Sequence, residues 1–293
     1  MKQKEDARRE RISKQNIKVN AELTMSPPET MPSSKYNNVE LIPWDPDSDI
    51  HAQRLYEQRV ACTWDQDLID EWKVKVREGK KFFYWIKLSD DFAGKDELIA
   101  KHIAKYPTEK EAIVDTATTL AKSSRTPTLT TFMPIGHIAL DLYPERNTQF
   151  SLPQSTVWIK SLYISRYVPT LKPQHPVIKI SFFFFFRTMQ SGGFGRSAMY
   201  QIEHLATCPP LNATTMALDT STKEYQTTPQ YLAYHSEMNG RKIEAKDFRS
   251  NEEWYVRQGY QAIARNERGY TWVDPKTGVE EVIPCVFLKK DIV

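Results

Sequence analysis

The 293-residue chain has little cysteine, no metal-binding histidine pattern and no long hydrophobic run. Its three cysteines, Cys62, Cys208 and Cys285, are odd in number and far apart, which argues against a disulfide framework and fits a reducing compartment. The six histidines lack the spacing of a metal site, so no metal is expected. No run approaches the roughly 18 apolar residues of a membrane span, and the first 24 residues lack the apolar stretch of a signal peptide. We therefore expect a cytoplasmic protein without a membrane contact, with the nucleus as the alternative location.

The chain also has little net charge, because 40 Lys and Arg residues nearly balance 37 Asp and Glu residues. A net charge of +3 does not indicate a nucleic-acid partner. With 40% hydrophobic and 26% charged residues, the composition is typical of a soluble globular protein. Residues 1–35 are polar and contain no aromatic side chain, which predicts a disordered tail before one folded domain over 36–293.

Only ten glycines are present, and three of them lie within residues 192–195. Glycines let a ligand approach the backbone closely and permit a positive φ. Apolar residues then recur with helical spacing at Ala198, Met199, Ile202 and Leu205. A glycine turn that leads into a helix directs free N–H groups at a phosphate or pyrophosphate, although a simple helix cap would show the same residues. Neither a P-loop nor a Rossmann glycine pattern is present.

The remaining chain predicts an α+β domain that starts in the order β-α-α-β. Strands are expected at 39–43, 81–88, 133–142, 157–165, 215–220, 260–264 and 282–288. Two helices are expected between the first two strands, and a short one is expected to start at Ser250 or Asn251 and to end at Gly259. The polar segment 89–131 has mostly helical patterns and predicts an external helical insertion, with a substrate lid as the alternative.

Two motifs carry a resemblance to a known family. Gln190-x-x-Gly193-x-Gly195 resembles the pyrophosphate-binding signature (Gln/Arg-x-x-Gly-x-Gly/Ala) of the GNAT superfamily of acyl-CoA N-acyltransferases. Tyr255-x-x-x-Gly259-Tyr260 resembles its second signature and follows in the expected order. The resemblance spans residues 39–293 and is strongest to GNAT-domain proteins of filamentous fungi. It implies a central mixed, mostly antiparallel sheet of six or seven strands, flanked by helices and splayed between strands four and five.

The resemblance also implies acetyl-CoA as cosubstrate, and it assigns site residues. In the fourth strand, the backbone of Leu162 and Ile164 would bind the pantetheine arm. Tyr255 would donate a proton to the leaving thiolate. The pyrophosphate would lie against eight consecutive residues: Gln190, Ser191, Gly192, Gly193, Phe194, Gly195, Arg196 and Ser197.

The proton acceptor is less well defined by the sequence. Asp219 is the candidate we select, and Asp141 and Glu203 stay open. We expect His137 to be a packed strand histidine. The family often has an asparagine seven residues before the tyrosine of the second signature, whereas Asn251 lies four residues before Tyr255, so a CoA-binding role of Asn251 stays open.

The activity implied is transfer of an acetyl group from acetyl-CoA to a primary amine. The acceptor is unknown, since a polyamine, an amino sugar, an aminoglycoside, a peptide N-terminus and a lysine side chain all remain open. A catalytically silent acyl-CoA-binding module, acting as sensor or interaction protein, is the alternative, and a protein whose glycine loop binds nothing is a third. The domain would act as a monomer or homodimer.

One segment, residues 167–187, does not fit the family pattern. It contains three prolines followed by five phenylalanines, where GNAT proteins have only a tight connection. Its ends are compatible with splice sites, and removing these 21 codons restores an arginine codon and places Gln190 five residues after Ile164. We therefore predict a translated intron, with a genuine flap over the CoA arm as the alternative. Sequencing the transcript decides between them.

Overall fold

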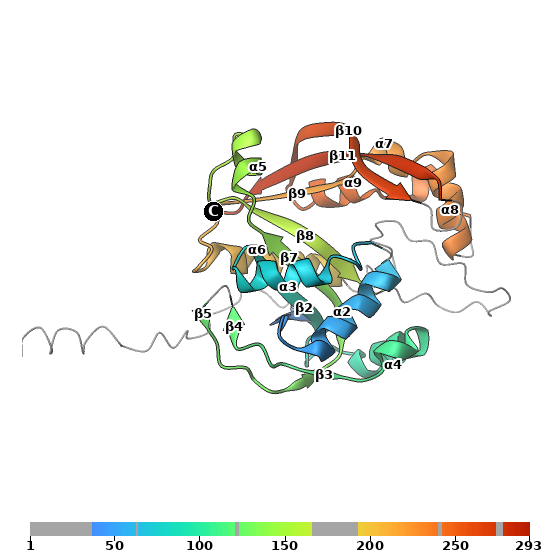
Figure 1. The fold of residues 1–293 in the computed structure, drawn as a ribbon. Coiled ribbons are helices and arrows are strands. Elements are labelled where there is room, and N and C mark those ends of the chain that lie inside the picture. Colours follow the sequence, from blue (N-terminus) through green and yellow to red (C-terminus); the bar gives the residue numbers. More distant parts are fainter. Residues whose placement is uncertain (1–36, 63, 121–122, 166–192, 240–241, 274–277) are drawn as a thin grey trace, which may run out of the picture. The chain divides into compact units, whose positions relative to one another are not determined.

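A seven-stranded sheet is the centre of the fold in a computed structural model, which describes residues 37–62, 64–120, 123–165, 193–239, 242–273 and 278–293 (Figure 1). All of these belong to one compact unit, Lys35–Val293. The strand order is β1-β2-β7-β8-β9-β11-β10, and every neighbouring pair is antiparallel except β8 and β9. The strands are β1 (Val39–Pro43), β2 (Lys81–Leu88), β7 (Pro134–Asp141), β8 (Val157–Ile164), β9 (Thr215–Ser221), β10 (Gln261–Val273) and β11 (Glu280–Asp291).

Helices cover both faces of the sheet (Figure 1). Successive strand residues point to opposite faces, so β2 sends Phe82 and Tyr84 into one core and Phe83 and Trp85 into another. The first core also contains α6 (Phe194–Thr207) and Tyr255 of α9 (Asn251–Val256), and the second contains α2 (Asp49–Cys62) and α3 (Ile69–Arg77). The other helices of the described residues are α4 (Lys95–Lys105), η2 (Pro107–Glu109), α5 (Pro144–Gln149), α7 (Lys223–Gln226), α8 (Pro229–Asn239) and η4 (Ala245–Asp247).

The parallel strands β8 and β9 pair only at their beginnings. Val157 faces Met216 and Trp158 faces Ala217, after which the strands diverge. In β8 the φ angle of Ser161 is +54°, and the register against β7 shifts opposite this residue, which describes a β-bulge. A splayed mixed sheet of seven strands, flanked by helices, is the α+β architecture that the sequence predicts, and this prediction is confirmed.

Two segments differ from the sequence prediction. The first half of the insertion is helical in α4, but its second half, expected to be helical around Ile113 and Leu120, forms four short strands: β3 (Ile113–Val114), β4 (Thr119–Leu120), β5 (Ser123–Ser124) and β6 (Thr131–Phe132). Between the predicted strands 133–142 and 157–165, where no helix is predicted, the chain forms the short helix α5, which starts at Pro144, a favourable first helical residue.

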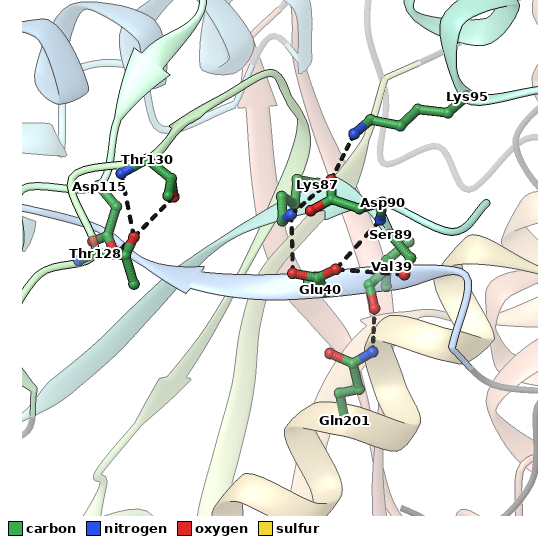
Figure 2. Close-up of polar contacts among 10 residues, drawn as sticks. All are labelled: Val39, Glu40, Lys87, Ser89, Asp90, Lys95, Asp115, Thr128, Thr130 and Gln201. Atoms are coloured by element: carbon green, nitrogen blue, oxygen red, sulfur yellow. Dashed lines mark hydrogen bonds and ion pairs between the residues drawn. The ribbon is translucent and has the colours of Figure 1, made fainter. Parts of the chain in front are cut away.

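The buried carboxylate of Asp115 explains the extended half of the insertion. It accepts hydrogen bonds from both terminal nitrogens of Arg125, at 2.8 and 2.6 Å. It also accepts from the N–H and hydroxyl groups of Thr128, which lies beside it in Figure 2. These partners lie 10 and 13 residues away, so a helical pattern cannot reveal them. These hydrogen bonds hold residues 115–120 and 123–128 in a loop around the carboxylate.

Some predictions cannot be compared with the structure. The predicted disordered tail, 1–35, and the predicted translated intron, 167–187, lie outside the described residues and stay predictions. Among the helices that the structure describes, none has the length and apolar character to cross a membrane. Within the same residues, no group of three or more His, Cys, Asp or Glu side chains could hold a metal ion.

Candidate active site

A cavity of about 210 Å³ opens where β8 and β9 separate. We call it the wedge cavity. Its walls come from both strands, from α9, from β10 and from the turn between α2 and α3. The lining residues are Trp64, Asp65, Ile159, Lys160, Ser161, Leu162, Leu218, Asp219, Thr220, Asn251, Tyr255 and Tyr270.

The wedge cavity passes through the sheet. Ile159 and Leu218 lie in the same core cluster as α6 and Tyr255. Their chain neighbours Lys160 and Asp219 also line the cavity, and alternation along a strand sends those side chains to the opposite face. The cavity therefore connects the face covered by α6 and α9 with the face covered by α2 and α3.

Tyr255 is positioned by a short but well-capped helix. The Ser250 hydroxyl accepts from the N–H of Glu253, and the Glu253 side chain accepts from the N–H of Ser250, which forms a capping box. The helix ends before Gly259, whose φ is +93°. Burial, together with the negative charge of Asp219, raises the pKa of Tyr255. The phenol is therefore protonated at neutral pH and can donate a proton.

Asp219 lies in the same cavity, but other groups occupy its carboxylate. Its Oδ1 forms ion pairs with Lys160 and with the Arg146 guanidinium, the latter at 3.0 Å. Its Oδ2 accepts a hydrogen bond from the Tyr270 hydroxyl at 2.6 Å. Burial favours the neutral acid, but Lys160, Tyr270 and Arg146 outweigh it and lower the pKa of Asp219. A carboxylate with a lowered pKa is a weaker base, so these contacts favour a positioning role over the predicted role of proton acceptor.

Neither alternative proton acceptor lines the wedge cavity. Asp141 is buried in an ion pair with Lys81 at 2.8 Å and also accepts from the Tyr143 hydroxyl. Glu203 on α6 accepts from the Tyr260 hydroxyl at 3.0 Å and pairs with Lys290 at 2.6 Å. Both carboxylates connect secondary-structure elements.

His137 is a packed strand histidine, as the sequence predicts. It is fully buried, and its ring nitrogens contact Gln58 Oε1 at 2.8 Å and an Arg59 nitrogen at 3.3 Å. Burial, together with the positive charges of Arg59 and Lys81, holds its pKa well below the ordinary value.

The second half of the glycine loop forms the start of α6. Gly193 is the N-cap, with a φ of +71°, a conformation that favours glycine. Phe194 is buried against Phe92, with ring centroids 5.1 Å apart, and Arg196 is exposed. The Ser197 hydroxyl accepts from the N–H of Asn38, just before β1. The first-turn N–H groups have no acceptor within the helix and are suited to an anion.

A second contact ties α6 to the sheet. The Gln201 side chain donates to the carbonyl oxygen of Val39 in β1 (Figure 2). The first half of the predicted pyrophosphate loop, Gln190, Ser191 and Gly192, lies outside the described residues. Its binding role, like that of Leu162 and Ile164, stays a prediction.

Sequence reasoning missed eight of the twelve residues that line the wedge cavity, and Trp64, Asp65, Lys160 and Tyr270 are the four of them that matter below. Lys160 has a signal in the sequence, since it is the one charged residue of the predicted strand 157–165. Tyr270 has none, because β10 was expected to end at residue 264. Asn251, whose family role was left open, does line the cavity.

No family model and no curated protein matches this chain. Among solved structures, the chain is similar to a GNAT-family acetyltransferase from Desulfovibrio desulfuricans, with a TM-score of 0.41 and 11% identity over 87% of this chain and 99% of that one. It is also similar to an aminoglycoside 6'-N-acetyltransferase in complex with coenzyme A, with a TM-score of 0.42 and 9% identity over 87% of this chain and 97% of that one. A third similar structure is NAA60 from Arabidopsis thaliana in complex with acetyl-CoA, with a TM-score of 0.43 and 9% identity over 87% of this chain and 98% of that one.

Proposed function

We propose that the protein transfers an acetyl group from acetyl-CoA to a primary amine. The observation that carries this proposal is the wedge cavity, which crosses the sheet and has Tyr255 in its wall. Diverging parallel strands leave backbone groups without strand partners, and an extended ligand with amide groups can pair with them as an added strand. The pantetheine arm of CoA is such a ligand.

In this proposal the cosubstrate and the acceptor meet inside the sheet. The pyrophosphate lies on the N–H groups at the head of α6, within residues 190–197, and the arm follows Leu162 and Ile164 of β8. The acceptor amine enters from the face of α2 and α3. Its nitrogen attacks the thioester carbonyl carbon, the C–N bond forms, and the C–S bond breaks with its electron pair on sulfur.

Two protons then complete the reaction. The Tyr255 hydroxyl supplies one to the thiolate sulfur, which becomes the thiol of CoA, and the phenolate is later reprotonated from water. The amine nitrogen loses the other. Asp219 is the acceptor that the sequence predicts, but its lowered pKa favours release to water, with Asp219 holding the shape of the cavity.

The experiment has two stages, applied to the purified full chain. Isothermal titration with CoA tests binding, and titration that shows no heat would contradict both the acetyltransferase and the silent acyl-CoA-binding module. Thiol release from acetyl-CoA, measured over a panel of amines, tests turnover. Binding without turnover of any amine would favour the silent module.

A further inference from the structure

The acceptor side of the wedge cavity contains a carboxylate that the reaction above does not use. Asp65 lies in the turn between α2 and α3 and lines the cavity together with Trp64. Its φ is +55°, which is uncommon for a residue other than glycine, although Asp and Asn tolerate it. A residue held in such a conformation is a candidate for a functional role.

Arg59 holds this turn in place. Its side chain is only 2% exposed, and Nε donates to the Trp64 carbonyl oxygen at 2.7 Å while a terminal nitrogen donates to Asp65 Oδ2 at 3.1 Å. The other terminal nitrogen contacts His137 of β7 at 3.3 Å. A buried cation anchored on the sheet thus orients the Asp65 carboxylate at the cavity.

The two carboxylates of the cavity differ in what they can still bind. Asp219 is 5% exposed and has both oxygens occupied. Asp65 is 35% exposed, and within the described part of the chain its Oδ1 accepts no hydrogen bond. A carboxylate oxygen oriented in this way can accept an N–H of an amine.

Two further features describe the acceptor. The rings of Trp64 and Tyr270 lie edge to face, 6.2 Å apart at 71°, and both line the cavity, so they provide aromatic surface beside Asp65. The charges near the carboxylates are positive in sum: Lys160, Arg59 and Arg146 against Asp65 and Asp219. A protonated monoamine carries one positive charge and spermidine carries about three, so this excess of positive charge repels spermidine more strongly than a monoamine.

We infer that Asp65 binds the acceptor nitrogen, and that the acceptor is a monoamine with a flat apolar body that packs on Trp64 and Tyr270. This inference rests on the proposed function, because it names the substrate class of the same cavity. It adds a specificity-determining residue, and it predicts that monoamines with an aromatic ring bind in preference to polyamines.

The test is binding of 2-phenylethylamine and of spermidine to the full chain by isothermal titration, with CoA present in excess. Asp65→Asn removes the charge and keeps a residue that tolerates the positive φ. Asp67→Asn is the matched control, because Asp67 is an exposed carboxylate of the same turn outside the cavity. We expect Asp65→Asn to weaken phenylethylamine binding at least about tenfold, the order of a charge-assisted hydrogen bond. Asp67→Asn should bind it like the wild type.

Spermidine should bind no more tightly than phenylethylamine. The inference is overturned if the wild type does not bind phenylethylamine, if Asp65→Asn binds it as well as Asp67→Asn does, or if spermidine binds more tightly. A parallel CoA titration without amine reports on the proposed function alone. Amine binding that depends on Asp65 in a chain that binds no CoA would overturn the proposed function and leave this assignment of the amine site standing.

Discussion

Lys160 of β8 and Asp219 of β9 form an ion pair across the point at which the two strands begin to diverge. The last paired residues, Trp158 and Ala217, come two positions earlier in each strand. Arg146 and Tyr270 converge on the same carboxylate from α5 and β10. The cluster therefore ties four elements together at the narrow end of the wedge cavity, and we expect it to set the width of the opening.

The first prediction separates the two roles of Asp219. Asp219→Asn leaves Lys160 and Arg146 without their countercharge, so we expect the free energy of unfolding to fall by about 1–3 kcal/mol, measured by urea denaturation. In the double variant Lys160→Gln with Asp219→Asn, part of this loss should be recovered, since only Arg146, which is 33% exposed, is then left without its countercharge. The kcat should stay within about tenfold of the wild type in both. A kcat loss of about 10²–10⁴ without a loss of stability would instead identify a proton acceptor.

Local signals in the sequence were enough for most of the fold. The strands around Trp85, Ile138 and Ile159 are apolar runs bounded by turn residues, and each lies where the sequence predicts it. The helix that carries Tyr255 was predicted from Ser250 and the acidic residues after it, and its capping box confirms this. These features depend on neighbours within a few residues, which a sequence shows directly.

What the sequence did not reveal depends on contacts between distant residues. The pKa of Asp219 depends on Arg146, 73 positions away, and on Tyr270, 51 positions away. The extended course of residues 113–132 depends on the partners of Asp115. The role proposed for Asp65 depends on the turn between α2 and α3, which lines the wedge cavity. Such groups look like ordinary surface charges in the chain.

The second prediction concerns the head of α6. Gly193→Glu places a side chain and a negative charge at the N-cap, where we propose that the pyrophosphate binds, so CoA binding by isothermal titration should be lost. Gly94→Glu is the matched control, because Gly94 is the N-cap of α4 and also has a positive φ, +83°. Both variants carry a similar backbone strain of about 1–2 kcal/mol. Equal CoA affinity in the two, with normal circular dichroism, would contradict the assignment of the loop.

The third prediction concerns Tyr255. Tyr255→Phe removes the proposed proton donor and keeps the buried ring, so kcat should fall by about ten- to a thousandfold while CoA affinity changes little. Tyr260→Phe serves as control. Its ring lies 5.8 Å from that of Tyr255, but its hydroxyl donates to Glu203 outside the cavity, so it should lose about 1 kcal/mol of stability and keep its kcat. An unchanged kcat in Tyr255→Phe would assign the residue to packing.

The last prediction is the pH dependence of kcat/KM for the amine. The pKa of Asp219 lies below its ordinary value, so this group stays ionised from about pH 5 upward. The pKa of Tyr255 is raised above its ordinary value, so the donor keeps its proton up to at least about pH 10. Of these three groups, the acceptor amine is the one that titrates in between, since an alkyl amine has a pKa of about 10.4 and reacts as the neutral base.

We therefore expect kcat/KM to rise about tenfold per pH unit between roughly pH 6 and 9, with no falling limb in that range. Tyr255→Phe should lower the whole profile by a constant factor and leave its slope unchanged, because the rising limb belongs to the amine. A plateau that begins near pH 7 would reveal a base within the protein. A falling limb below about pH 9 would mean that the proton donor is a group with a lower pKa than Tyr255, and the proposed role of this residue would be wrong.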